Sequence, residues 1–312
     1  VDLYLHLRDP INFAKMNRII ITADDFGYSK ERNMGIVECF LSGTVTTISL
    51  LVNGIHCEDA IQLAAKHNIP LERIGLHLNL SEGTPLSLPE YVASLLNKEG
   101  FFRGKIGFCN AIKARLIKYN EVKLEIKAQI DKYRILTGRL PLHVDGHQHV
   151  HVTEIFSDVL KANGINCTRQ CGELNIDKYL YIDDARRRFY VEKSEESGIA
   201  KIVFRNNGIW CPDYFVGLST SGADMNIERL KAAITKAFNF NTGDATKQFV
   251  CEIMVHPGYC TKQDGGCGCG PDDFSKIQDR EHEMDILKSD KLKETFSELG
   301  VSLISYCNIK VS

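Results

Sequence analysis

The sequence lacks the features that would place the protein in a membrane or on a nucleic acid. No apolar run approaches the roughly 18 residues that a membrane helix needs. Neither charge sign predominates, because 38 Lys and Arg residues stand against 40 Asp and Glu residues in a chain of 312. Nucleic-acid-binding domains usually carry a basic patch or stripe. We therefore expect a soluble protein without a membrane or nucleic-acid partner.

Three common catalytic motifs are also missing. The chain has no Gly-x-Ser-x-Gly, no Gly-x-x-x-x-Gly-Lys-Ser/Thr and no His-Glu-x-x-His, which removes the usual anchors of serine hydrolases, phosphate-loop enzymes and zincins. Its 11 cysteines are odd in number and scattered, and no signal-peptide pattern opens the chain. We therefore expect a reducing, cytoplasmic location. Residues 1–15 precede Met16 and look like an N-terminal extension or leader.

Apolar strand patterns alternate with helical patterns along the rest of the chain. We expect one α/β domain over residues 16–312, because no linker or change in composition interrupts the alternation. Helices are predicted at 30–41, 110–137 and 226–238, and residues 275–299 are expected to be mostly helical. The loop from 81 to about 105 contains Phe101 and Phe102, and its length favours a lid or a substrate wall.

The first strand pattern ends at two adjacent carboxylates, Asp24 and Asp25, followed by Phe26 and Gly27. Like charges at the end of a buried strand are costly unless a positive group lies beside them. This favours a divalent cation. The alternative is a solvated turn, because Asp-Asp-x-Gly is ordinary loop chemistry.

Histidines are concentrated in residues 143–151, which contain His143, His147, His149 and His151. They lie at the end of a predicted strand, where the loops of a (β/α) barrel form active sites. Neutral imidazole is a common ligand for divalent metals. Solvated loop histidines are the alternative, and spacing does not decide which of the last three would reach a metal.

Two further histidines occupy similar positions. His77 lies in an apolar strand pattern at 74–80, and His256 follows another strand and precedes Pro257 and Gly258. By itself, His77 would suit a hydrogen-bonded core position as well as a ligand role. His256 would suit a structural turn as well as acid–base catalysis. One acidic and three histidine-containing segments at strand ends nevertheless favour one shared site over four separate explanations.

These motifs together resemble the YdjC/ChbG-type carbohydrate deacetylases. The matches follow the family's order and cover nearly the whole chain from Arg18 onward. They comprise the segments 22–27, 46–54, 75–77, 143–151, 213–218 and 256–259, together with Asn33 and Gly35. The resemblance implies a single-domain distorted (β/α) barrel of the glycoside hydrolase/deacetylase type and hydrolysis of N-acetyl groups on amino-sugar oligosaccharides.

The resemblance also implies roles for individual residues. Asp25, His77 and His147 look like the metal ligands, Asp24 like the general base and His256 like the acid. Mg²⁺ is the metal the family implies, whereas two imidazoles would suit Zn²⁺ or Mn²⁺. We further expect a small saccharide substrate and a homodimer. Substrate-binding or supporting roles are assigned to Asn53, Asn79, Asp145, His149, His151 and Tyr259.

The expected chemistry is hydrolysis by a metal-activated water, with an aspartate base and a histidine acid. Two rival functions fit the same residues. The first is metal-dependent hydrolysis of another bond, such as a phosphoester or a cyclic amide, and the second is saccharide binding without catalysis. The loop 260–269 could also hold a zinc or redox site through Cys260, Cys267 and Cys269, although Cys-x-Cys is not usual zinc-finger spacing.

Overall fold

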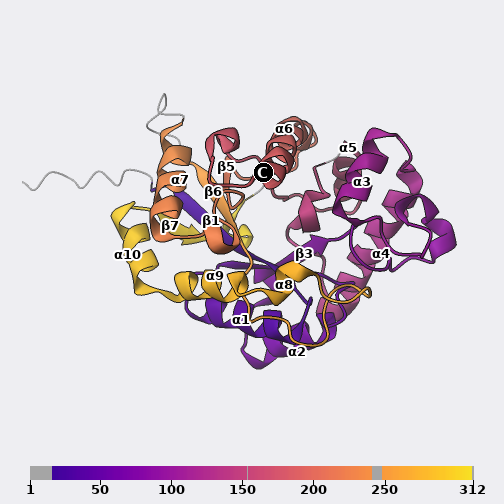
Figure 1. Ribbon diagram of the computed structural model, residues 1–312, viewed down its shortest axis with the longest axis horizontal. Helices are drawn as coiled ribbons and strands as arrows, with labels where there is room; N and C mark the ends of the chain where they lie inside the picture. Colours follow the sequence, from indigo (N-terminus) through magenta and orange to yellow (C-terminus); the bar gives the residue numbers. More distant parts are fainter. Residues whose placement is uncertain (1–15, 153, 241–247, 311–312) are drawn as a thin grey trace, which may run out of the picture.

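The computed structural model describes residues 16–152, 154–240 and 248–310, and the expected extension at 1–15 lies outside them. Helices surround the strands on the outside of the molecule (Figure 1). The strands are β1 (Arg18–Phe26), β2 (Thr47–Leu50), β3 (Ile74–Leu78), β4 (Val144–Gly146), β5 (Tyr214–Val216), β6 (Val250–Val255) and β7 (Ser302–Ile304). The helices are α1 (Lys30–Leu41), α2 (Cys57–Lys66), α3 (Gly104–Lys113), α4 (Tyr119–Thr137), α5 (Glu154–Ala162), α6 (Asp184–Asn206), α7 (Ile227–Asn239), α8 (Asp273–Lys276), α9 (Asp279–Lys288) and α10 (Asp290–Glu298).

All pairs of neighbouring strands in the sheet are parallel. The order is β4-β3-β2-β1-β6-β5, and β7 pairs with the first residues of β1. β1 therefore lies in the middle, with β6 along one edge and β7 followed by β2 along the other. Because the strands are parallel, their carboxyl ends share one side of the sheet, where active sites form in such folds.

An irregular segment closes the gap between β4 and β5. Isolated bridges join Val144 to Thr168, Cys167 to Trp210 and Glu173 to Phe215. The segment thus takes the place of a strand without regular pairing. The prediction of a distorted (β/α) barrel is confirmed.

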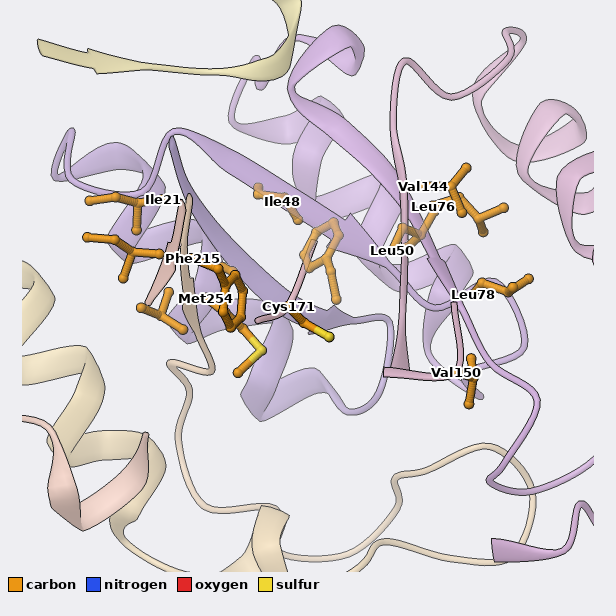
Figure 2. Close-up of a cluster of buried hydrophobic side chains, with 14 of the residues drawn as sticks. Ile21, Ile48, Leu50, Leu76, Leu78, Val144, Val150, Cys171, Phe215 and Met254 are labelled. Carbon is orange, nitrogen blue, oxygen red and sulfur yellow. The ribbon is translucent and has the colours of Figure 1, made fainter. Parts of the chain in front are cut away.

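Strands β1, β2, β3, β4 and β6 place apolar side chains in the core and polar side chains between them. Leu50, Leu76 and Val144, from three neighbouring strands, belong to one buried apolar cluster (Figure 2). Burying such a side chain fully contributes roughly 1.5–3 kcal/mol. The alternate positions hold equally buried polar residues, namely Thr22, Asp24, Ser49, His77, Asp145 and Glu252. The apolar cluster must offset the cost of this polar interior.

The structure corrects two expectations about the elements. The helix predicted over 110–137 is two helices, because α3 ends before Arg115, which has a left-handed φ of 56°, and α4 begins at Tyr119. Phe102 does not form a substrate wall: it is buried, and its N–H donates to the carbonyl of Gly83. Within the described ranges, no helix is long and apolar enough to cross a membrane.

Candidate active site

A cavity of about 250 Å³ opens at the carboxyl ends of the strands. Its lining includes six residues predicted from the sequence, namely Asp24, Asp25, His77, His147, His149 and His256. Other parts of the wall come from Tyr28, Lys105, Phe189 and Phe274. The structure therefore brings the six predicted residues, from four segments of the sequence, to one place.

The end of β1 directs two adjacent carboxylates into this cavity. Successive side chains of a strand normally point to opposite faces. Asp25 departs from the strand, because its φ of 68° is left-handed and the register with β2 shifts between Ala23 and Phe26. Both carboxylates thereby line the cavity, and both are buried, with exposures of 1% for Asp24 and 5% for Asp25.

His77 is on β3, and its ring lies between the carboxylates of Asp145 and Asp25. Its Nδ1 is 2.7 Å from Oδ1 of Asp145, and its Nε2 is 3.4 Å from Oδ1 of Asp25. Asp145 in turn accepts a hydrogen bond from the hydroxyl of Ser49. Burial acts to lower the pKa of His77, but Asp24, Asp145 and Asp25 outweigh it and raise the pKa to about 9.

His147 lies on the single 3₁₀ turn His147–His149 that follows β4. Its Nδ1 is 2.9 Å from Oδ1 of Asp25, and its Nε2 is 2.9 Å from Oε2 of Glu82. Burial acts to lower the pKa of His147, but these two carboxylates raise it well above its ordinary value. In return, the imidazoles of His147 and His77 hold the pKa of Asp25 well below its ordinary value, although burial alone would raise it.

Asp25, His77 and His147 fit a divalent cation. Each offers one ligand atom, and the three atoms lie within 4.8 Å of one another. One carboxylate and two imidazoles form a donor set that transition-metal ions accept readily. A second cluster joins Asp24, His77 and Asp145. Arg169 binds both of those carboxylates, so a guanidinium already supplies the positive charge there.

The local charge balance favours the same conclusion. The network of ion pairs around Asp24 and Asp25 buries four carboxylates but two guanidinium groups, which leaves two negative charges unless the histidines are protonated. The groups counted are Asp24, Asp25, Asp145 and Glu252 against Arg32 and Arg169. A divalent cation would supply the missing charge without protonating the imidazoles.

Arg169 is the centre of the polar interior, and sequence reasoning did not find it. Its guanidinium donates to both oxygens of Asp24, at 2.6 and 2.7 Å, and its Nε donates to Glu252 at 3.0 Å. It also contacts Asp145 at 2.9 Å. Burial raises the pKa of Asp24 above its ordinary value, whereas Arg169 acts to lower it. Arg169 therefore fixes the direction of the Asp24 carboxylate.

His256 lines the cavity after the end of β6. Its backbone N–H donates to Glu283 at 2.6 Å, and its ring packs edge-on against Phe274 with centroids 5.6 Å apart. Its Nδ1 has no hydrogen-bond partner among the described residues. Burial, together with the charges of Arg280 and Arg32, lowers the pKa of His256 well below its ordinary value, so the resting imidazole is neutral.

Comparison with known proteins assigns the chain to a family. The family model described as YdjC-like protein matches residues 18–298. The chain belongs to the YdjC-like family. Relatives named carbohydrate deacetylase are 42% identical in Mus musculus, over 92% of this chain and 93% of theirs, and 38% identical in Danio rerio, over 93% and 97%. The resemblance inferred from the sequence motifs is confirmed.

Two more distant matches also cover nearly the whole chain. A protein of Escherichia fergusonii named chitooligosaccharide deacetylase is 28% identical over 93% of this chain and 98% of its own. A crystal structure from Enterococcus faecalis V583, described as a candidate cellobiose-phosphate cleavage protein, matches with a TM-score of 0.66. It covers 94% of this chain and 98% of that one at 23% identity, which supports the fold.

Of the residues predicted to support the site, some contact a proposed ligand or line the cavity, one is buried nearby, and one lies away from the cavity. Asp145 contacts His77, and His149 lines the cavity. His151 is buried beneath it, without a hydrogen-bond partner for either ring nitrogen among the described residues. Tyr259 does not line the cavity, because its hydroxyl donates to Glu38 of α1 at 2.8 Å.

The two predicted asparagines hold a loop rather than the cavity wall. Asn53 donates to the carbonyl of Thr84 at 3.2 Å and accepts from Asn79. Asn79 accepts from the N–H groups of Ser81 and Glu82 at 3.0 and 2.9 Å. Both residues thus stabilise the segment that follows β3.

Glu82 and Arg169 were missed because no motif pointed to them. Glu82 stands in a loop pattern, and Arg169 lies in the irregular segment that closes the barrel. A lone Arg or Glu in such a segment is usually a solvated side chain. The sequence signal available was indirect: four buried carboxylates require positive partners somewhere in the chain.

Proposed function

We propose that this YdjC-like protein is a metal-dependent deacetylase that hydrolyses N-acetyl groups of amino-sugar oligosaccharides. The observation that carries the proposal is the meeting of Asp24, the Asp25–His77–His147 donor set and His256 in one cavity. Relatives named carbohydrate deacetylase, matched over nearly their whole length, support it.

Asp25, His77 and His147 would hold the cation. When bound, a divalent ion polarises an acetyl carbonyl and lowers the pKa of a water molecule. Asp145 supports this arrangement by fixing the ring of His77 through Nδ1, which leaves Nε2 facing Asp25. The family resemblance favours Mg²⁺, and the two imidazoles favour Zn²⁺ or Mn²⁺.

Asp24 is the general base in this proposal. Arg169 holds both of its oxygens in a bidentate ion pair, so the carboxylate has one orientation at the cavity floor. Its burial raises its pKa, which strengthens it as a proton acceptor. Asp24 would accept the proton of the water that attacks the acetyl carbon.

His256 acts on the leaving group in this proposal. Its ring lines the cavity and packs against Phe274. Nδ1 is buried 4.0 Å from Oε1 of Glu283, so the ring would meet a substrate through its other nitrogen. Because its resting imidazole is neutral, the proton that it gives to the departing amine would be the one released by the attacking water and first accepted by Asp24. Tyr28, Phe189 and Phe274 would provide aromatic walls for the sugar.

The decisive assay measures acetate release from a panel of N-acetylated saccharides. We expect turnover that a chelator abolishes and that one of Mg²⁺, Mn²⁺ or Zn²⁺ restores. Phosphate release from phosphoesters without acetate release would favour hydrolysis of another bond. Saccharide binding without turnover under any of the metals would favour a binding protein.

Asp24→Asn tests the base directly. We expect a fall in kcat of about 100-fold or more, because an amide cannot accept the proton. Metal content, measured by elemental analysis, should stay near the wild-type value, because Asp25 and not Asp24 faces both imidazoles. Full turnover by this variant would remove Asp24 from the mechanism.

A further inference from the structure

We propose that Glu82 is a positioning residue that selects the metal-facing nitrogen of His147, and that the Gly/Cys loop 265–272 holds Glu82 in place. This inference rests on the proposed function. Glu82 contacts the ring from the side opposite Asp25: its Oε2 is 2.9 Å from Nε2, while Oδ1 of Asp25 is 2.9 Å from Nδ1. The Glu82 side chain is 11% exposed.

The position of Glu82 fixes the tautomer of His147. A carboxylate only accepts hydrogen bonds, so each ring nitrogen that faces one carries a proton. Asp25 is itself a proposed ligand, so on cation binding Nδ1 would give up its proton, while Nε2 keeps the proton that it donates to Glu82. His77 has the reverse arrangement, because Asp145 occupies Nδ1 and leaves Nε2 facing Asp25. The two imidazoles would therefore ligate through different nitrogens, each set by its own carboxylate.

The backbone of Glu82 is fixed from β3. Oδ1 of Asn79 accepts from the N–H of Glu82 at 2.9 Å, and Nδ2 of Asn79 donates to the carbonyl of Glu82 at 2.8 Å. Gln129 of α4 holds Asn79 through both of its backbone groups. Asn79 therefore acts on the site through Glu82 rather than by touching a substrate.

The other oxygen of Glu82 connects it to the Gly/Cys loop. The hydroxyl of Tyr28 donates to Oε1 of Glu82 at 2.9 Å and accepts from the N–H of Asp272 at 2.8 Å. The carbonyl of Tyr28 accepts from the N–H of Gly266 at 2.9 Å. A chain of hydrogen bonds thus runs from the loop through Tyr28 and Glu82 to His147.

Packing ties the same loop to the segment of Glu82. Cys267 is fully buried against Tyr28 and Leu51, and its carbonyl accepts from the N–H of Thr84 at 2.8 Å. A Cβ on Gly83 would lie 1.9 Å from that carbonyl, so the two backbones are in direct contact. The loop that could have held a zinc or redox site through its cysteines instead packs as a support for Glu82.

The test measures Zn²⁺ affinity by calorimetry on the metal-stripped full-length protein. We expect Glu82→Ala to weaken binding about 10- to 100-fold, the usual effect of removing such a partner. Glu82→Gln should weaken it less, because the amide oxygen can still accept from Nε2. Tyr28→Phe should weaken binding about threefold to tenfold, the value of one lost hydrogen bond.

Glu125→Gln is the matched control. Glu125 is also a buried carboxylate that orders the segment after β3, through the N–H groups of Leu86 and Ser87. It accepts from Gln129, and glutamine can keep that hydrogen bond, but among the described residues Glu125 is hydrogen-bonded to neither Glu82 nor a histidine. We expect wild-type affinity in this variant. Equal weakening by Glu82→Gln and Glu125→Gln would overturn the inference, because general loosening of the loop would then explain both.

A second readout identifies the ligating nitrogen. In ¹⁵N-detected spectra of the Zn²⁺-loaded protein, assigned with His147→Gln, we expect a protonated Nε2 and a metal-bound Nδ1 for His147. Ligation through Nε2, or unchanged affinity in Glu82→Ala, would overturn the inference. Tight, Glu82-dependent Zn²⁺ binding without deacetylase activity would instead refute the proposed function and leave the positioning role intact.

Discussion

At the scale of single residues, one guanidinium serves three carboxylates. Arg169 has no exposed surface and contacts Asp24, Asp145 and Glu252. The planar fork of arginine can bind several oxygens in fixed directions, whereas the ammonium of lysine acts as a point charge. The orientation of the proposed base therefore depends on the shape of Arg169 as well as on its charge.

Arg169→Lys should separate these two contributions. We expect kcat to fall about 100-fold, with metal content retained, because Asp24 loses its bidentate partner. The free energy of unfolding should fall by up to about 3–5 kcal/mol, the cost of breaking a buried ion pair. Both are measured on the purified protein, by acetate release and by denaturant titration.

Arg186→Lys is the matched control for that substitution. Arg186 also bridges two carboxylates, Asp183 and Asp224, but it lies on the surface of α6. Exposed pairs are worth about 0–1 kcal/mol, so stability and turnover should change little. Wild-type turnover in Arg169→Lys would show that charge alone is sufficient.

Two buried histidines should make the protein sensitive to acid. Burial lowers the pKa of His143 to about 4 and that of His151 to about 3, below the value near 6.5 expected in the unfolded chain. A depressed pKa contributes stability that is present above pH 6.5 and is lost as the pH falls through the folded-state pKa. Stability should therefore decline between pH 6.5 and 3.

His143→Phe tests this prediction. The ring of His143 stacks on Tyr306 with centroids 4.0 Å apart, and phenylalanine can retain that stack. Between pH 7 and 3.5, the free energy of unfolding should fall in both proteins, but by about 3 kcal/mol less in the variant, because the variant has no imidazole to titrate at this position. Denaturant titrations at several pH values measure the difference, and parallel curves for the two proteins would contradict it.

At the scale of elements, α1 packs its backbone directly on the loop that carries His256. A Cβ on Gly35 would lie 2.4 Å from the Cα of Gly258, so no side chain fits between them. This contact, together with the hydrogen bond from Arg32 of α1 to the carbonyl of His256, fixes the position of the His256 backbone relative to α1. The contact joins two backbones and involves no side chain of the cavity.

Gly35→Ala should disturb both stability and turnover. We expect a loss of about 1–3 kcal/mol from overpacking, together with reduced acetate release as His256 is displaced. Gly198→Ala in α6 is the control, because nothing lies within 4 Å of the added Cβ. It should stabilise the protein by up to about 1 kcal/mol. A neutral Gly35→Ala would show that the loop moves freely.

Prediction of the elements succeeded where apolar periodicity was strong. α7 and β6 lie where the pattern placed them, within a residue or two. α6 was not predicted, because its apolar residues do not mark one buried face: Ile199 and Ile202 are 60% and 62% exposed. Only tertiary contacts and charged neighbours define such a helix, and a local pattern does not record them.

At the scale of the whole molecule, the sequence predicted the residues of the site better than their partners. Parallel strands bring their carboxyl ends together, so Asp24, Asp25, His77 and His147 could be grouped from strand ends alone. Arg169 and Glu82 approach from irregular segments, and their positions depend on how the barrel closes. A homodimer and a cytoplasmic location stay predictions.

Metal removal should destabilise the folded protein. A ligand that binds only the native state at 100 times its dissociation constant stabilises it by about 2.7 kcal/mol. We expect a chelator to lower the thermal midpoint measured by calorimetry, and the matching cation to restore it. His77→Ala is the control, because this variant lacks one proposed ligand. Its thermal midpoint should be the same with and without metal.

The three proposed ligands are unevenly distributed over the fold. Asp25 and His77 lie near the ends of β1 and β3, and His147 follows β4. These strands lie on one side of the sheet together with β2, while β5 and β6 supply no ligand. A cation there would cross-link one half of the barrel, whereas β6 is tied to that half by strand pairing, by packing and by the ion pair of Arg169 with Glu252. In hydrogen-exchange experiments, chelation should therefore speed amide exchange in β2, β3 and β4 more than in β5 and α7. Amide exchange rates would then distinguish the half of the barrel that binds the metal from the half that does not.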